Sequence, residues 1–583
     1  MITTESKGGL NLPKQTRETI QKHKAQEVVW QIGDYLRGII SAKENLVYRI
    51  GLSALGFMIK NNPDNSLTNL DLEAEIKEET TLRFLRKLIK NHSEQVEFLV
   101  NKYSAEELAA SVLYAEPRLY RQEAECSTPS GVSKLALSLL DIQDGDVVLD
   151  LGSGVGSFLL EASHCSDNIK LHGVEINTES VIIANLRSVV SGIPLTIMQG
   201  NMVSQDHSEV HANKVFSNFP VGVRMQQLQK DMEQNKNLKR CFETARRSNS
   251  GDWVYAVASY LNMENPGRTV VLMSNAGTWN KPDEFLRKRL LENGDIEGVI
   301  QLSPGLFTHT AMPFTMLVLS PSNEDVKMVD ASEFYTKERR QNILSVEDVK
   351  KIVNAYHNET DSSRTVTLEE IAKQEFIINP GRYLLPKIDL TAETLSLGDI
   401  CLSINRGAMI RSSELDALVT HEETGYQYLM LQNIKDGLIE SGLPNLLEVS
   451  VRDEKYCIKD GNLVISKTSP FKIAVARIRE GETILANGNL YFLELDESKV
   501  NPTFVSAFLQ SEYGLAQLNA LSKGAVMKNI SIQDLKMVKI PDLSMEQQNA
   551  IAEEYEKLGD ELIMLQRQAE LIRDKRANLI ETS

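Results

Sequence analysis

The chain is poor in cysteine and has no long hydrophobic run. Its five cysteines are scattered, odd in number and without paired spacing; they are Cys126, Cys165, Cys241, Cys401 and Cys457. This pattern argues against disulfides and zinc ligands, so we expect reduced thiols and no metal site. No apolar stretch approaches the length of a membrane span, and the first residues lack signal-peptide character. We therefore expect a cytoplasmic protein that does not bind a membrane.

An excess of positive charge is also missing, because the formal net charge is −17 at pH 7. This negative net charge argues against general, non-specific affinity for nucleic acid, although an acidic protein can still hold a locally basic cleft. Hydrophobic residues make up 42% and charged residues 25% of the chain, as in ordinary globular proteins. With 583 residues the chain is too long for one core, and about two to four domains are expected.

The hydrophobic pattern changes along the chain and divides it into four segments. Residues 28–60 and 82–114 show helical spacing, whereas strands and helices alternate from about 117 to 322. We expect strands at 147–151, 171–175, 195–199, 214–217, 269–274, 297–302 and 314–319, and a helix at 345–356. The predicted domains are a helical domain (1–116), an α/β domain (117–385), a mixed α/β domain (386–543) and a C-terminal helix (544–583).

Residues 147–158 predict a strand, a tight turn and the start of a helix. Three glycines at alternate positions follow an aspartate at the end of the strand: Asp150, then Gly152, Gly154 and Gly156. Such a turn lets backbone N–H groups approach a ligand, and the next strand ends in Glu175, about twenty residues further on. An acidic residue at that distance suits a nucleotide ribose. Dinucleotide enzymes, S-adenosylmethionine enzymes and plain tight turns all produce a glycine loop, so the loop alone leaves these three open.

In detail the loop resembles the first motif of class I S-adenosylmethionine-dependent methyltransferases, which have a Rossmann-like α/β fold. The resemblance implies that the glycines shape a site for S-adenosyl-L-methionine, that Asp150 braces the loop and that Glu175 binds both ribose hydroxyls. A third strand ends at Gly200-Asn201, where such enzymes place the side chain that reads the cofactor's adenine. Asn201 is therefore expected in that role.

The fourth expected strand is followed by Asn218-Phe219-Pro220-Val221, at the sheet edge where open α/β folds bind ligands. The exocyclic amine of a base is a poor nucleophile, because its nitrogen lone pair is conjugated into the ring. Two acceptors bonded to the amino hydrogens favour the pyramidal geometry that attacks a methyl group. The Asn218 side-chain oxygen and the Phe219 carbonyl are the candidates. A base flipped out of a duplex is also helped by an aromatic platform.

These motifs together resemble the modification subunit of type I restriction–modification systems, an adenine-N6 DNA methyltransferase. That family's fourth motif is usually Asn-Pro-Pro-Phe. Asn218 and Pro220 match it, and Phe219 replaces a proline but keeps its carbonyl. Val221 stands where the stacking aromatic is expected, with Phe219 as a neighbouring substitute.

Further segments carry the same resemblance over about residues 28–385. Residues 126–130 are similar to the family's Thr-Pro motif, which implies that Thr128 contributes to the methionine end of the cofactor site. Residues 30–38 and 297–307 resemble the start of the family's helical domain and its sixth-strand region.

The chain after residue 385 resembles half of a type I specificity subunit. The resemblance rests on Gly398-Asp399-Ile400, on 459–467 and on 524–541. Such subunits normally carry two recognition domains and two spacer helices, whereas this chain has one of each. Double-stranded DNA is the implied partner. Candidate DNA contacts, each of which is at least as readily a solvated surface charge, are Lys467, Lys472, Arg477, Arg479, Lys523 and Lys528.

The last segment carries a heptad seam. Its members step by four and three through Ile551, Tyr555, Leu558, Leu562, Leu565, Ala569, Ile572, Arg576 and Leu579. The pattern favours a coiled coil over one helix packed on its own domain. A helix over 551–579 would span about 40 Å, so two copies could pair and hold two recognition domains apart. We expect a homo-oligomer through this helix.

Two function classes follow from these observations. The first is a site-specific DNA adenine-N6 methyltransferase of a restriction–modification or related phage-defence system. The second, favoured by Val221, is a cofactor-binding recognition or scaffold subunit with weak or no methylation activity. A methyltransferase acting on RNA or protein is disfavoured by the resemblance to a recognition domain. Since no nuclease pattern or P-loop is evident, cleavage would need a separate restriction or translocase subunit, and a separate specificity subunit could also join.

Overall fold

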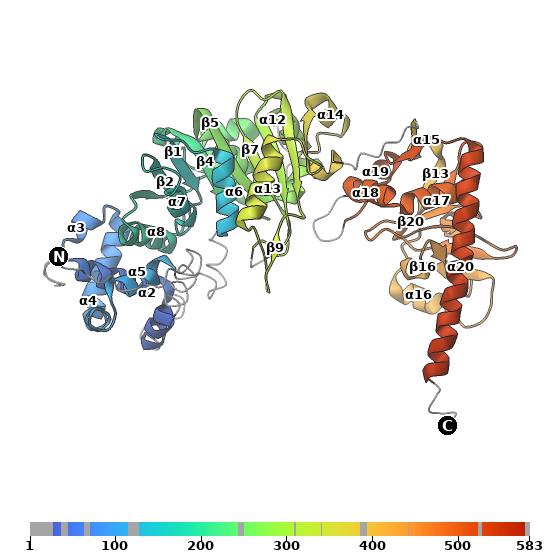
Figure 1. Ribbon diagram of the computed structural model, residues 1–583, viewed down its shortest axis with the longest axis horizontal. Helices are drawn as coiled ribbons and strands as arrows, with labels where there is room; N and C mark the ends of the chain where they lie inside the picture. The colour runs from blue at the N-terminus through green and yellow to red at the C-terminus, as the bar shows by residue number, and fades with distance from the viewer. Residues whose placement is uncertain are drawn as a thin grey trace, which may run out of the picture. The chain divides into compact units, whose positions relative to one another are not determined.

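The computed structural model describes residues 27–36, 45–62, 70–114, 128–242, 250–307, 310–339, 341–384, 393–440, 442–522 and 528–577. The chain forms two compact units, Met1–Pro380 and Gly381–Ser583 (Figure 1). The finer division into four domains stays a prediction. In the part of the chain that is described, no helix combines the length and apolar character needed to cross a bilayer.

The first unit begins with helices that pack on one another and on α8 (Figure 1). They are a helix over 27–35, α2 (Asn45–Asn61), α3 (Leu72–Glu75), α4 (Glu79–Lys102) and α5 (Ala105–Leu113). Their core includes the fully buried Leu55 and Leu85 and continues into Leu186 of α8 (Thr178–Ser191). The helices predicted over 82–114 are confirmed as α4 and α5, and Ser104 separates them by capping α5 in a capping box with Glu107. Within the helical segment predicted over 28–60, residues 37–44 lie outside the described residues.

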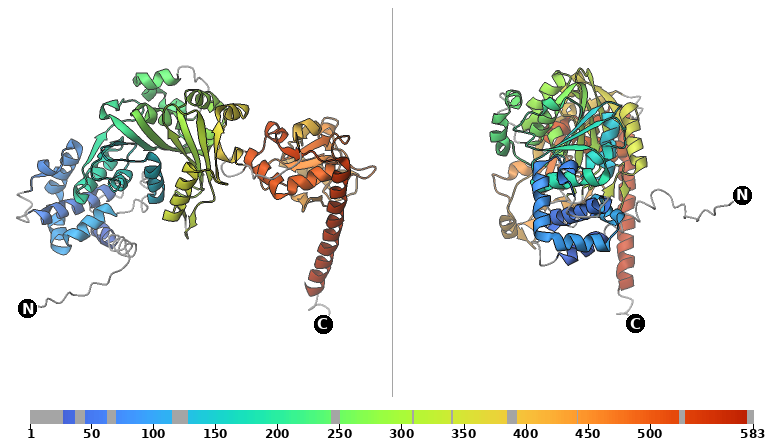
Figure 2. Two further views of the ribbon diagram at one scale, coloured as in Figure 1. Left: turned by 45° about the horizontal axis from the view of Figure 1, so that its top comes forward. Right: turned by 90° about the vertical axis from the view of Figure 1, so that its left-hand side faces the viewer.

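A β-sheet forms the centre of the first unit (Figure 2). It has nine strands in the order β11-β8-β6-β7-β5-β4-β1-β2-β3. The strands are β1 (Val147–Leu151), β2 (Lys170–Glu175), β3 (Leu195–Gln199), β4 (Ala212–Asn218), β5 (Met263–Ser274), β6 (Ile296–Leu302), β7 (Phe314–Leu319), β8 (Asp325–Ala331) and β11 (Ser363–Thr367). The seven predicted strands are confirmed, while β8 and β11 are additional. Both contain several polar residues, which weakens the apolar signal of a buried strand.

Strand direction brings the functional loops of this unit to one edge. β1 pairs in parallel with β2 and β4, and β2 pairs in parallel with β3, so the carboxyl ends of these four strands meet. β7 is antiparallel to both β5 and β6. The main core lies between the sheet and α6 (Ser130–Leu140), α7 (Ser157–Ala162) and α13 (Val346–His357).

The second unit is a mixed α/β structure, as expected for residues after the boundary. One sheet has the order β13-β23-β20-β21 and another the order β14-β18-β15-β22-β19. The strands of the first sheet are β13 (Cys401–Arg406), β20 (Leu463–Ser466), β21 (Ile473–Val475) and β23 (Leu490–Leu495). Apolar residues of this sheet share a core with α17 (Pro502–Gln510), α18 (Glu512–Leu521) and α19 (Ile532–Lys536). The strands of the second sheet are β14 (Val419–Thr420), β15 (Tyr426–Leu429), β18 (Asn445–Leu446), β19 (Cys457–Ile458) and β22 (Thr483–Ala486).

The start of the second unit is held by a buried ion pair. The Arg382 guanidinium lies 2.7 Å from the Asp534 carboxylate of α19, and both side chains are buried. Arg382 also donates a hydrogen bond to the carbonyl of Leu521. The few residues after Pro380 are therefore integrated into the second unit.

The predicted C-terminal helix is confirmed as α20 (Met545–Ala577), which extends beyond the rest of its unit (Figure 2). Its first turns pack on α17, where Gln548 and Ala552 are buried and Tyr555 receives a hydrogen bond from Gln510. Further along, seam residues are solvent-exposed: Leu558 is 55%, Leu565 55% and Ile572 65% exposed. The helix thus combines a docked first part with an exposed apolar seam.

Candidate functional site

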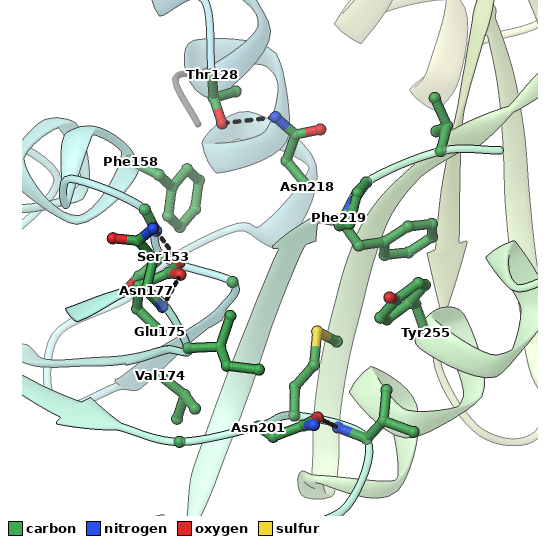
Figure 3. Close-up of a pocket in the computed structure, with 18 of the residues that line it drawn as sticks. Thr128, Ser153, Phe158, Val174, Glu175, Asn177, Asn201, Asn218, Phe219 and Tyr255 are labelled. Atoms are coloured by element: carbon green, nitrogen blue, oxygen red, sulfur yellow. Dashed lines mark hydrogen bonds between the residues drawn. The ribbon is translucent and has the colours of Figure 1, made fainter. Parts of the chain in front are cut away.

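A pocket of about 470 Å³ opens where β1, β2, β3 and β4 end (Figure 3). It is lined by most of the residues whose motifs predict cofactor binding or catalysis: Thr128, Gly152, Gly154, Glu175, Asn201, Asn218, Phe219 and Pro220. Asp150 and Gly156 are not among the lining residues. The structure therefore brings the glycine loop and the Asn218 segment to one cavity.

The glycine loop adopts a conformation that other residues rarely take. Gly152 has φ +84°, and a Cβ added there would meet no atom within 4 Å, so the loop leaves open space in front of its backbone. Gly156 has φ +77° and forms the N-cap of α7, where a Cβ would lie 3.3 Å from Ala184. Gly156 thus shapes the loop from behind the pocket wall.

Glu175 links the loop to the end of β2. One carboxylate oxygen accepts a hydrogen bond from Gly154 N at 2.8 Å, and the other accepts from Asn177 N at 2.7 Å. Each oxygen keeps a second lone pair, so the buried carboxylate can still accept hydrogen bonds from ligand hydroxyls. This geometry fits a ribose bound against the loop.

Two further polar groups at the loop are buried without hydrogen-bond partners, Asp150 Oδ1 and Ser153 Oγ. Burial, reinforced by the negative charge of Glu175, raises the pKa of the Asp150 carboxyl well above its ordinary value. Ser153 lines the pocket and was not singled out from the sequence. Unsatisfied buried groups are rare in proteins, and a polar ligand in the pocket would give Ser153 a partner. The polar groups of this pocket therefore fit a nucleoside-type cofactor.

Asn218 is oriented by a contact that its sequence context did not reveal. Its amide nitrogen donates a hydrogen bond to Thr128 Oγ1 at 3.1 Å (Figure 3). The side-chain oxygen of Asn218 is then the part of the amide left to accept from a ligand. Thr128 thus touches the predicted catalytic residue and also lines the pocket assigned to the cofactor.

Phe219 is not an open stacking platform. Its ring is 2% exposed and stacks on Tyr255 of α11 (Asp252–Leu261), with ring centroids 5.0 Å apart and planes 20° from parallel. Val221 lines the pocket but packs partly against the main core. The idea that Phe219 stands in for the missing aromatic therefore requires the ring to leave this stack.

Asn201 lies at the other end of the pocket from Asn218 and Thr128 (Figure 3). Its side-chain oxygen accepts from Val203 N at 2.9 Å, and its amide nitrogen donates to Asp231 at 3.0 Å. Asp231 comes from α9 (Met225–Gln234) and also lines the pocket. The sequence offered no signal for Asp231, because it follows no recognised motif.

The candidate DNA-binding residues of the second unit differ in their surroundings. Arg477 pairs with Glu556 of α20 at 2.5 Å and bonds Thr503, which indicates a role inside the unit. Lys472 donates to the Leu431 carbonyl, and Lys467 lies over the Tyr491 ring. Arg479 and Lys528 are exposed. Lys523 lies outside the described residues.

The sheet order, the antiparallel β7 beside β5, the glycine loop after β1 and the carboxylate ending β2 define a class I methyltransferase fold. This confirms the expected fold class of the first unit. The chain combines two families: residues 114–389 match N-6 DNA Methylase, and residues 390–573 match the Type I restriction modification DNA specificity domain. The two matches thus divide the chain near residue 390 into a part similar to N-6 DNA methylases and a part similar to type I DNA specificity domains.

Similar proteins carry related names. The MjaVIII and MjaVII methylase subunits of type I restriction enzymes from Methanocaldococcus jannaschii are 27% and 29% identical. The matches cover 49% and 46% of this chain, and 53% and 50% of those proteins. The chain therefore spans about half the length of these curated relatives.

Among solved structures, a type I methyltransferase subunit from Streptococcus thermophilus is 18% identical, with a TM-score of 0.47. The match covers 62% of this chain and 98% of that one. The type IIG restriction endonuclease BpuSI is 12% identical, with a TM-score of 0.49, over 91% of this chain and 74% of that one.

Proposed function

We propose that this protein is a site-specific DNA adenine-N6 methyltransferase that uses S-adenosyl-L-methionine in a restriction–modification or related phage-defence system. The observation that carries the proposal is the shared pocket. Asn218, Phe219 and Pro220 line the same cavity as the glycine loop and Glu175. A methyl acceptor held by the first group would therefore meet a cofactor held by the second.

The residues of the glycine loop and β2 would hold the cofactor. Gly152 and Gly154 allow the backbone to approach it, Glu175 accepts from the ribose hydroxyls, and Ser153 supplies a buried hydroxyl. When bound, S-adenosyl-L-methionine supplies an electrophilic methyl group. Asp150 is buried in β1 directly before the loop, a position that suits a bracing role.

The target amine would be oriented by the segment after β4. Asn218 Oδ1 and the Phe219 carbonyl accept from its two hydrogens, which directs the nitrogen lone pair toward the methyl group. Thr128 fixes which end of the Asn218 amide faces the amine, because it already accepts from Nδ2. A bound cofactor would supply the methyl group, and the amine held by Asn218 Oδ1 and the Phe219 carbonyl would release one proton to solvent.

We further propose that the second unit recognises double-stranded DNA and that two copies pair through α20. The exposed seam residues include Leu558, Leu562 and Leu565. Charge also supports antiparallel pairing, because acidic residues outnumber basic ones in the first half of α20, whereas basic residues prevail in the second. Antiparallel helices would place these halves opposite each other. A restriction or translocase subunit, or a separate specificity subunit, would join in the cytoplasm.

A second candidate function is a cofactor-binding recognition or scaffold subunit that methylates weakly or not at all. The observation in its favour is the lack of an open aromatic at the motif. Val221 replaces the expected ring, and Phe219 is buried against Tyr255. A flipped adenine would then lose stacking of about 1–3 kcal/mol per base.

The experiment that tests the proposal is sequencing with base-modification detection on DNA from cells that express this chain alone. The matched control is Asn218→Ala. A defined motif carrying N6-methyladenine that disappears in the control would establish the enzyme and its target. If no modification appears even with candidate partner subunits present, the recognition or scaffold function is favoured instead.

A further inference from the structure

The adenine end of the proposed cofactor site holds a carboxylate beside the residue expected to read the base. Asn201 uses its side-chain oxygen to accept from Val203 N at 2.9 Å and Ser204 N at 3.4 Å. Its amide nitrogen donates to Asp231 Oδ2 at 3.0 Å. Both ends of the Asn201 amide are therefore engaged in holding the loop after β3.

Asp231 has the capacity that Asn201 lacks. A carboxylate offers about four lone-pair positions, and the bond from Asn201 occupies one. The side chain is partly exposed and lines the pocket at the same end as Asn201. Its negative charge reaches into the cavity, since it contributes, after burial, to raising the pKa of Tyr255 in the pocket wall.

We infer that Asp231 accepts a hydrogen bond from the exocyclic amine of the cofactor's adenine, with Asn201 orienting the carboxylate. The inference rests on the proposed function. An acceptor at this place distinguishes a 6-amino purine, which donates a hydrogen there, from a 6-oxo purine, which presents an oxygen. Two facing acceptors repel and leave buried polar groups unpaired, so the oxo form is rejected. Asp231 is thus a specificity-determining residue.

The Asp231→Asn variant reverses this preference with little change of shape. The new amide must direct its oxygen at Asn201 Nδ2, so its NH₂ group faces the base. That group clashes with an adenine amine but donates to a 6-oxo oxygen. The matched control is Glu233→Gln, which removes one negative charge from the exposed face of the same helix.

The test is calorimetric titration of the full chain with S-adenosylhomocysteine and with S-inosylhomocysteine, without DNA or turnover. We expect the wild type and Glu233→Gln to bind the adenine compound at least about tenfold more tightly. In Asp231→Asn the ratio should fall by about tenfold or invert. A purely structural role for Asp231 would weaken both ligands equally and leave the ratio unchanged, which would overturn the inference alone. If the wild type binds neither compound, the cofactor proposal itself fails and the inference with it.

Discussion

Replacing Thr128 by valine distinguishes two roles for this residue: positioning Asn218 and contacting the cofactor. Valine keeps the branched shape but lacks the oxygen that accepts from Asn218 Nδ2 at 3.1 Å. Without that acceptor the Asn218 amide gains freedom to turn and present its NH₂ group to the target amine. If Thr128 is a positioning residue, its loss lowers turnover and leaves cofactor binding nearly intact.

The size of the effect follows from one hydrogen bond. A neutral pair contributes about 0.5–1.5 kcal/mol net, which corresponds to roughly a two- to thirteenfold preference for the productive amide orientation. We therefore expect kcat of Thr128→Val to fall by about that factor. The dissociation constant for S-adenosylhomocysteine should change less than about twofold, because no cofactor contact is removed.

The assay is methyl transfer to a duplex carrying the motif found by modification sequencing, together with calorimetric titration of S-adenosylhomocysteine. Thr128→Ser, which retains the hydroxyl, is the matched control and should recover most of the turnover. Weakening of cofactor binding by about tenfold in Thr128→Val, with kcat at saturating cofactor unchanged, would refute this positioning role. Thr128 would then act as the cofactor contact that the family resemblance implies.

Three further predictions concern the motif, the C-terminal helix and the glycine loop. Val221→Phe should raise turnover on the target duplex by roughly five- to thirtyfold, which corresponds to about 1–2 kcal/mol of added base stacking. Unchanged activity would show that stacking is not limiting. Leu558→Glu places a charge in the seam and should convert a dimer to monomers in sedimentation equilibrium. Met564→Glu lies off the seam and should leave the dimer intact. Equal effects of the two variants would contradict the pairing. Asp150→Asn should raise the melting temperature more at pH 8 than at pH 4. In the folded protein the pKa of Asp150 is raised, whereas the unfolded chain releases this proton near the ordinary pKa of 3.8. The stability of the wild type therefore falls as pH rises above 3.8, and asparagine, which does not ionise, avoids this loss. A pH-independent difference in thermal melts would contradict this.

The sheet could be predicted where buried strands form continuous apolar runs. β1 and β7 are such runs and match their predicted bounds, and β3 also matches although only Ile197 of it is buried. The alternation with helices indicates an α/β sheet, but neither the order of its strands nor the antiparallel direction of β7. β11 could not be found in this way, because Ser363–Thr367 lies at the sheet edge and is mostly polar. The helices expected over 82–114 are separated at Ser104, where a capping box with Glu107 starts α5 although apolar spacing continues across it.

The candidate site was predictable as a set of residues but not as a set of contacts. Motif spacing indicated the residues of the glycine loop, Glu175 and Asn218, and the structure places these lining residues in one pocket. The bonds of Asn218 to Thr128 and of Asn201 to Asp231 join side chains far apart in sequence. Such pairs depend on side-chain rotamers in the folded chain, which periodicity and spacing do not encode.

The ion pair of Arg382 with Asp534 determines where this protein can be divided or recombined. A module that began after residue 385 would leave the guanidinium behind, and removing one partner of a buried pair costs about 3–5 kcal/mol. That loss is comparable to the whole stability of a small domain. A transplant intended to give the protein a new target sequence should therefore begin at Gly381. Natural exchange of target specificity by recombination would face the same constraint, so Arg382 should travel with the DNA-recognition half.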